Sequence, residues 1–192
     1  MQLVDKIVLR EKGDSANIDA TNLHARMSWK KAVDLDLYAI YQKKDGSEGR
    51  VYFGSKGSLT SAPYIQLDKD AGVGNRAGDN QENMRFADLS HYNHVLIVAN
   101  IFAQSDAVFA QYDGNVQVMF GSQTIEVPLT SKDRGNNCVI AHIDNTGAAG
   151  PKLINANRTL TSLPTVAGYL RGEGQSSGPS SGGGLLGRLF GR

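Results

Sequence analysis

The sequence predicts an all-β protein, built as an antiparallel β-sandwich. Several short stretches alternate apolar and polar residues with a period of two, which is the period of a strand. Glycine-rich turns separate these stretches, as in sandwiches and barrels. No stretch shows a sustained helical period with end caps, apart from a weak signal near the end of the folded part.

Each predicted strand follows from its own pattern. Residues 33–41 alternate regularly, with Leu35 and Leu37 on one face. Residues 94–103 are apolar on both faces, which is typical of a central strand. Gly121-Ser122 separates two alternating runs and predicts a tight hairpin. In chain order, the predicted strands are residues 7–9, 17–29, 33–41, 94–103, 116–120, 125–129 and 138–143.

Length and composition exclude several classes of protein. The 192 residues suit one domain with appendages, which we place at residues 1–171. The balance of 20 basic and 19 acidic residues gives no broad basic face and argues against a nucleic-acid binder. A single cysteine, Cys138, excludes an internal disulfide framework, and its apolar surroundings predict a buried thiol. With no signal peptide and no membrane-length apolar run, we expect a cytoplasmic protein.

Acidic residues are concentrated in two stretches of the sequence, and both are candidate parts of a cation site. Residues 67–83 hold three Asp, one Glu and three Asn among glycines, and such a loop supplies the oxygen ligands that Ca²⁺ prefers. The spacing is not that of an EF-hand. Asp34 and Asp36, two residues apart on a strand, point to one face and repel each other unless a cation lies between them. Spacing alone leaves open a calcium site and an ordinary solvated acidic surface.

An ordered series of motifs resembles one known family. Over residues 7–160 the chain is similar to the TerD-type bacterial stress proteins, and within them to the TerA branch associated with tellurium resistance. The motifs that carry the resemblance are Asp34-Leu35-Asp36-Leu37, residues 44–51, Gly57-Ser58, residues 63–70 and residues 78–83. The resemblance implies a β-sandwich that binds Ca²⁺ through acidic loops, without established catalysis. It also implies protein partners from the same stress system, including a membrane component.

Carried over by position, the resemblance implies a set of metal ligands. They are Asp34, Asp36, Asp68, Asp70, Asp79, Asn80 and Glu82. The chain departs from the family pattern in two places: in residues 78–82 one of the family's consecutive acids is replaced by Asn80 or the spacing is shifted, and Ala71 stands where the TerA-like branch has further acids. Because fewer negative charges weaken Ca²⁺ binding, we expect weaker binding than the full pattern would give.

The C-terminal residues form two further segments. Residues 172–184 are a Gly/Ser-rich, disordered linker by composition. In residues 185–192, apolar side chains fall on one side of a short helix and two arginines on the other, while two glycines weaken a free helix by about 1 kcal/mol each. The candidate partner-binding residues are Leu185, Leu186, Arg188, Leu189, Phe190 and Arg192. Docking on a protein partner or a second copy, a frayed terminus, and weak membrane contact all remain open.

The sequence is also compatible with two other classes of function. The same carboxylates could hold Mg²⁺ or Mn²⁺ in a metal-dependent phosphate-ester hydrolase. Alternatively, the protein could be a structural assembly component whose terminal segment docks on the next subunit. We expect no enzyme, because the sequence contains no nucleophile elbow, P-loop or dinucleotide fingerprint, although a triad that meets only in space stays open.

Overall fold

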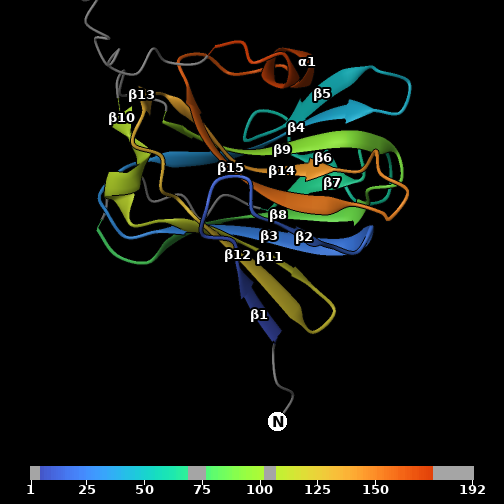
Figure 1. Ribbon diagram of the computed structural model, residues 1–192, viewed down its shortest axis with the longest axis horizontal. Coiled ribbons are helices and arrows are strands. Elements are labelled where there is room, and N and C mark those ends of the chain that lie inside the picture. The colour runs from blue at the N-terminus through green and yellow to red at the C-terminus, as the bar shows by residue number, and fades with distance from the viewer. Residues whose placement is uncertain (1–4, 69–76, 102–106, 175–192) are drawn as a thin grey trace, which may run out of the picture.

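The computed structural model describes residues 5–68, 77–101 and 107–174, which fold into two β-sheets stacked around one core (Figure 1). This confirms the predicted all-β sandwich. The first sheet holds, in spatial order, β1 (Asp5–Val8), β12 (Gln123–Pro128), β11 (Asn115–Phe120), β3 (Thr21–Trp29), β8 (Asn80–Asp88), β7 (Ile65–Leu67) and β6 (Gly57–Ser58). The second holds β2 (Ser15–Asn17), β15 (Lys152–Leu160), β14 (Asn137–Asp144), β9 (Tyr92–Ile101), β4 (Leu35–Lys43) and β5 (Glu48–Val51).

A short ribbon and two short helices complete the described chain. The ribbon pairs β10 (Ala107–Val108) with β13 (Arg134–Gly135). The helices are the 3₁₀ helix η1 (Phe109–Tyr112) and the helix α1 (Val166–Leu170). β1 runs parallel to β12, whereas every other strand pair of the described residues is antiparallel. None of the helices in the described ranges is long and apolar enough to cross a membrane.

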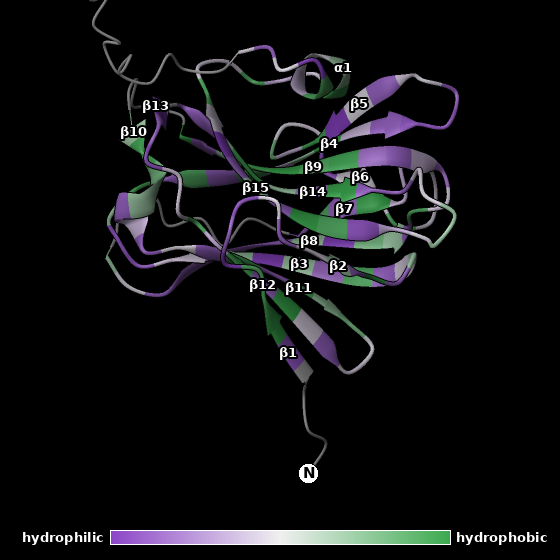
Figure 2. Cartoon of the chain, viewed as in Figure 1, coloured by the Kyte–Doolittle hydropathy of each residue, from purple (hydrophilic) through white to green (hydrophobic). Residues whose placement is uncertain are grey.

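Alternation along the strands places the core between the sheets, as Figure 2 shows in the hydrophobic and hydrophilic bands along both. Leu35 and Leu37 of β4 are buried in this core together with Val116 and Val118 of β11. The predicted hairpin joins β11 and β12, where Gly121 takes a positive φ of 52° that favours glycine.

The central strand β9 is buried on both faces, as its composition predicts. It lies between β14 and β4, and Val95 and Ile97 point into the main core. Leu96 and Val98 point outward into a second, smaller apolar cluster, which Val166 of α1 covers. The short helix therefore lies on the outer face of the second sheet (Figure 1).

The structure corrects the interpretation of two residues. Asn80 and Glu82 were expected in a loop, but both lie in β8, and Glu82 is buried. Phe53 is 43% exposed, whereas Trp29 is buried and its indole Nε1 donates to the Val33 carbonyl at 2.8 Å.

Candidate functional site

Three connections meet at one end of the sandwich. β3 ends there at Trp29, which pairs with Asn80 at the start of β8, and Ser28 pairs with Asn115 at the start of β11. Backbone hydrogen bonds tie the connections together: the Gly78 amide donates to the Lys30 carbonyl at 2.9 Å, and the Lys30 amide donates to the Tyr112 carbonyl at 3.3 Å. We call residues 30–34, 77–80 and 112–115 the acidic end.

A hollow of about 220 Å³ opens at the acidic end. Two sequence-predicted ligands, Asp79 and Asn80, line it together with Asp113 and Asn115, which the sequence had not indicated. The amide oxygen Oδ1 of Asn115 is buried and accepts no hydrogen bond from the residues that the structure describes. A buried oxygen without a donor is costly, and a cation or a water molecule would satisfy it.

Two basic side chains share this hollow. Arg26 and Lys30 line it beside the carboxylates of Asp79 and Asp113, so these four formal charges cancel. Ca²⁺ favours sites with an excess of carboxylate, because ligand charge sets much of its affinity. The described part of the hollow is therefore suited to weak cation binding.

Glu82 links the two sheets beside the acidic end. The side chain is 6% exposed, and its Oε2 accepts a hydrogen bond from the Leu37 amide of β4 at 2.5 Å. β5 pairs with β4 only from Ala39 onward, so the Leu37 amide has no strand partner on that side. The Glu82 carboxyl group therefore supplies the hydrogen-bond acceptor that a neighbouring strand would otherwise provide for this amide.

Asp34 directly precedes β4 and Asp36 is its second residue, and both are half-buried. Asp36 projects from the outer face of the second sheet, as does Tyr38. Burial raises the pKa of the Tyr38 hydroxyl, and the nearby charge of Asp36 raises it further, with a smaller effect from Glu82. Asp36 and Glu82 therefore both act electrostatically on the Tyr38 hydroxyl, although they come from different sheets.

Asp68, another of the nominated ligands, has a cationic partner in Arg85. Its Oδ2 lies 3.1 Å from Nη2 of Arg85, and its backbone amide donates to the Asn83 carbonyl. Such an exposed ion pair contributes about 0–1 kcal/mol, so a metal ion could displace Arg85 at little cost.

The structure thus brings some of the nominated residues together and not others. Asp79 and Asn80 share the hollow, Asp34 belongs to the same end, and Asp36 and Glu82 lie along the strands that leave it. Within residues 5–68, 77–101 and 107–174, no group of three or more His, Cys, Asp or Glu side chains is arranged to hold a metal ion. Asp70 and the candidate partner-binding residues 185–192 lie outside the described residues.

Asp113 and Asn115 could have been found from the sequence only in part. Asp113-Gly114 is a turn signal directly before the alternating run 116–120, and Asp113 does adopt a left-handed conformation with φ of 51°. The pairing of that run with residues 17–29, which sets them beside Asp79, is not visible in the sequence.

A cluster of titratable groups lies on the outer face of the second sheet, away from the acidic end. A hydrogen bond of 3.1 Å joins His94 Nδ1 and His142 Nε2, and Asp144 Oδ1 lies 3.6 Å from His94 Nδ1. Burial lowers the pKa of His142 to about 4, and His94 contributes to that shift. The strand register brings these groups together, because Asp144 of β14 lies opposite His94 of β9.

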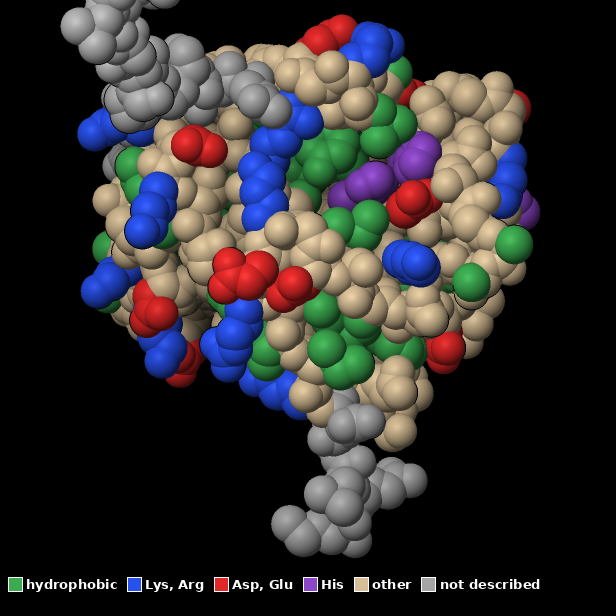
Figure 3. Space-filling model, viewed as in Figure 1, with side chains coloured by type: hydrophobic (Ala, Val, Ile, Leu, Met, Phe, Trp, Pro, Cys, Tyr) green, Lys and Arg blue, Asp and Glu red, His purple; other side chains and the backbone are tan. Residues whose placement is uncertain are grey.

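Cys138 is the buried thiol that its surroundings predicted. Burial raises its pKa to about 12, so the thiol stays protonated and unreactive near neutral pH. On the face shown in Figure 3, acidic and basic side chains are interspersed around small apolar areas.

No family model, curated protein or solved structure matches the chain. Residue chemistry and geometry therefore carry the functional assignment.

Proposed function

We propose that this chain is a non-enzymatic calcium-binding module of a bacterial stress response associated with tellurite resistance. The observation that carries the proposal is the hollow at the acidic end, which Asp79, Asn80 and Asp113 line together with Asn115, whose buried amide oxygen has no donor among the described residues. The TerD-like order of motifs supports the same assignment.

The metal ligands in this proposal include residues from the sequence and from the structure. Asp113 and Asn115 join the set because they line the same hollow as Asp79. For Ca²⁺ to bind in this hollow, the negative charge of the carboxylates must exceed the positive charge of Arg26 and Lys30. The proposal assigns part of this negative charge to Asp70, the nominated acid closest in sequence to Asp68. The nominated set is Asp34, Asp36, Asp68, Asp70, Asp79, Asn80 and Glu82.

The role of Ca²⁺ in this proposal is structural. A bound cation cancels the repulsion among the carboxylates and fixes the connections at the acidic end, which then present a defined surface to protein partners. Partners from the same stress system, one of them a membrane component, follow from the resemblance. We expect a cytoplasmic location.

Thermal unfolding in EDTA, in millimolar Ca²⁺ and in millimolar Mg²⁺ tests the proposal. A ligand at about 100 times its dissociation constant stabilises the fold by about 2.7 kcal/mol, which raises the melting temperature of a domain of this size by roughly 5–10 °C. We expect this rise with Ca²⁺ and a much smaller one with Mg²⁺. Trp29 lines the hollow, so its fluorescence should change over the same Ca²⁺ range.

Two variants and one control locate the effect. Asp79→Asn and Asp70→Asn should each remove most of the Ca²⁺-dependent rise. Asp45→Asn should leave it unchanged, because Asp45 is an exposed acid in the turn at the far end of β4, where it binds Ser47. A larger rise with Mg²⁺ would favour the phosphate-ester hydrolase instead. Equal melting temperatures in all three solutions would contradict the calcium module and favour the assembly protein.

A further inference from the structure

The helix α1 is fixed to the second sheet at both of its ends. At its start, Oε2 and Oε1 of Glu48 accept hydrogen bonds from the amides of Val166 and Ala167 at 2.9 and 2.8 Å. At its end, the Arg158 guanidinium donates to the Tyr169 and Glu173 carbonyls at 2.8 and 2.9 Å. The chain therefore leaves the described fold from a fixed point.

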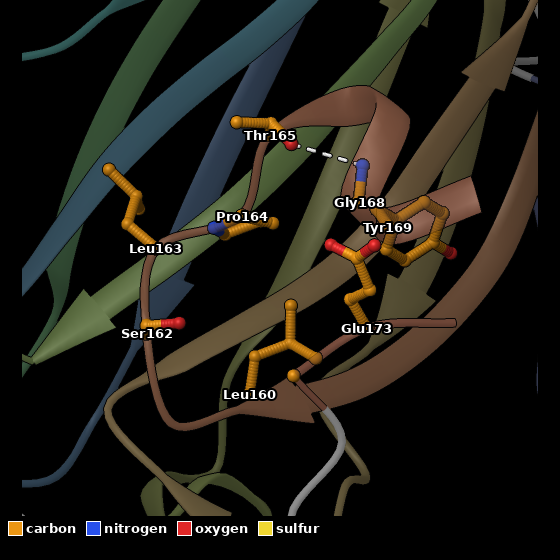
Figure 4. A pocket seen from close by; sticks show the side chains of 9 residues that line it. Leu160, Ser162, Leu163, Pro164, Thr165, Gly168, Tyr169 and Glu173 are labelled. Atoms are coloured by element: carbon orange, nitrogen blue, oxygen red, sulfur yellow. Dashed lines mark hydrogen bonds between the residues drawn. The ribbon is translucent and has the colours of Figure 1, made fainter. Parts of the chain in front are cut away.

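A cavity of about 200 Å³ lies between α1 and the end of β15 (Figure 4). Its apolar walls come from Leu160, Leu163, Pro164 and Tyr169. Pockets for whole small molecules usually measure roughly 300–1,000 Å³, so this cavity suits one or two side chains of a peptide. Leu170, on the same helix, is 48% exposed and extends the apolar surface.

The chain itself supplies an apolar segment close to this cavity. Gly174, the last residue described, lines the cavity, and ten Gly/Ser-rich residues, 175–184, separate it from Leu185. A flexible linker of that length has a root-mean-square span of about 17 Å. Such a tether holds a segment at a local concentration in the millimolar range, far above micromolar protein in solution.

We propose that residues 185–192 dock on the α1 cavity of the same molecule, with apolar side chains of the segment filling it. Glu173 already pairs with Arg171 at 2.7 Å, so Leu185, Leu186, Leu189 and Phe190 carry the contact rather than the two arginines. The docked segment masks the α1 surface until a partner competes for it. The contact is independent of the acidic end and holds whether or not the protein binds Ca²⁺.

Disulfide trapping in the full-length chain tests this proposal. Ser162 is exposed and lines the cavity, so the pair Ser162→Cys and Gly191→Cys places one thiol at each side of the contact and keeps all four apolar residues. Cys138 stays out of the reaction because it is buried. With oxidised dithiothreitol at about 1 µM protein, we expect an intramolecular disulfide, detected as a monomer of altered mobility that loses its shift on reduction.

The matched control carries the same cysteine pair together with Leu185→Ser, Leu186→Ser and Phe190→Ser. Its linker is identical, so chance encounters between the thiols are equally frequent. We expect the disulfide to form at least tenfold more slowly in this control. Bulky maleimide should also label the single variant Ser162→Cys more slowly in the native chain than beside the three serines.

Two results would overturn the proposal. Equal rates of disulfide formation and of labelling in the two backgrounds would mean that the apolar residues do not dock on α1. Covalent dimers whose yield rises with protein concentration would mean that the segment of a second copy occupies the cavity. Neither result depends on Ca²⁺, so the calcium proposal is tested separately.

Discussion

His142 combines deep burial with a group that titrates near neutral pH. It is 8% exposed on β14, and the charged or titratable groups that face it are His94 from β9, Asp144 from its own strand and Tyr169 from α1. Burial lowers its pKa from 6.5 to about 4, and it lowers the pKa of His94 as well, in spite of the opposing charge of Asp144. Both histidines are therefore neutral in the native protein over a pH range in which the unfolded chain is protonated.

This difference predicts a loss of stability on mild acidification. As the pH falls from 6.5 toward 4, the unfolded state binds a proton that folded His142 excludes, so the free energy of unfolding decreases, by up to about 3 kcal/mol in total. Urea unfolding at about pH 7 and about pH 5 measures it. Carboxyl groups with lowered pKa values, such as Asp144, lose their contribution only below their unfolded value of 3.8.

The variant His142→Asn separates this residue from the rest of the protein. It should reduce the difference in stability between the two pH values by more than half, with the remainder due to His94. His91→Asn is the matched control, because the His91 side chain is exposed. A wild-type protein equally stable at both pH values would show that buried His142 accepts its proton in the fold.

At the level of single residues, the sequence predicts burial better than it predicts polar partners. The buried thiol of Cys138 follows from the apolar run around it. The burial of Glu82 does not follow, because its pattern is that of a solvated acid, whereas in the fold its carboxylate accepts a hydrogen bond from the Leu37 amide. Whether a polar side chain is buried depends on whether the fold places it beside a backbone group that needs a hydrogen-bond partner.

Among the elements, α1 depends on one side chain from β5. Glu48 accepts hydrogen bonds from two amides in the first turn of a five-residue helix, which is too short to be stable alone. Losing such a cap costs about 1 kcal/mol. We therefore expect Glu48→Ala to speed amide hydrogen exchange in residues 166–170 roughly five- to tenfold, while β9 and β14 keep wild-type exchange rates.

A matched variant controls for the loss of charge. Glu173→Ala breaks the exposed ion pair with Arg171, whose side chains are 61% and 62% exposed, so it should change the exchange rates little. Exchange that increases equally in β9 and in α1 would show that Glu48 supports the whole fold and not the helix alone.

The hydrophobic pattern of the sequence does not predict the strand β15. After Leu153, which lies in the main core, its buried positions include Asn155, Asn157 and Thr159, so apolar alternation does not continue along it. These side chains bind backbone groups of neighbouring segments: Asn155 Nδ2 donates to the Leu9 carbonyl at 3.0 Å, and Asn157 Nδ2 donates to the Pro128 carbonyl at 2.8 Å. Buried amides act here as links between connections, which hydrophobic periodicity cannot reveal.

Over the whole molecule, the pairing of distant strands decides what the acidic end contains. The sequence predicts the strands 17–29 and 116–120, yet only their observed register sets Asn115 opposite Ser28 and Asn80 opposite Trp29. Pairs so far apart in sequence are fixed by the packing of the complete core. The motifs therefore single out the nominated acids as candidates, whereas Asp113 and Asn115, which line the same hollow as Asp79, are found only from the structure.

One core joins the two sheets, and this continuity determines how the molecule unfolds. Leu23 and Met27 of the first sheet and Leu37 and Ile97 of the second belong to a single buried cluster that includes Trp29. A shared core couples both sheets in one cooperative transition. Trp29 is the only tryptophan, so its fluorescence reports the acidic end, while far-UV circular dichroism reports all strands.

We expect the two probes to give the same urea midpoint in EDTA and to move together when Ca²⁺ is added. Binding at the acidic end stabilises the native state as a whole, because no part of a two-state protein unfolds without the rest. A Trp29 midpoint below the circular dichroism midpoint in EDTA would instead show that the acidic end opens first. In that case Ca²⁺ would bring the two midpoints together, and the cation would act on a local unit and not on the core.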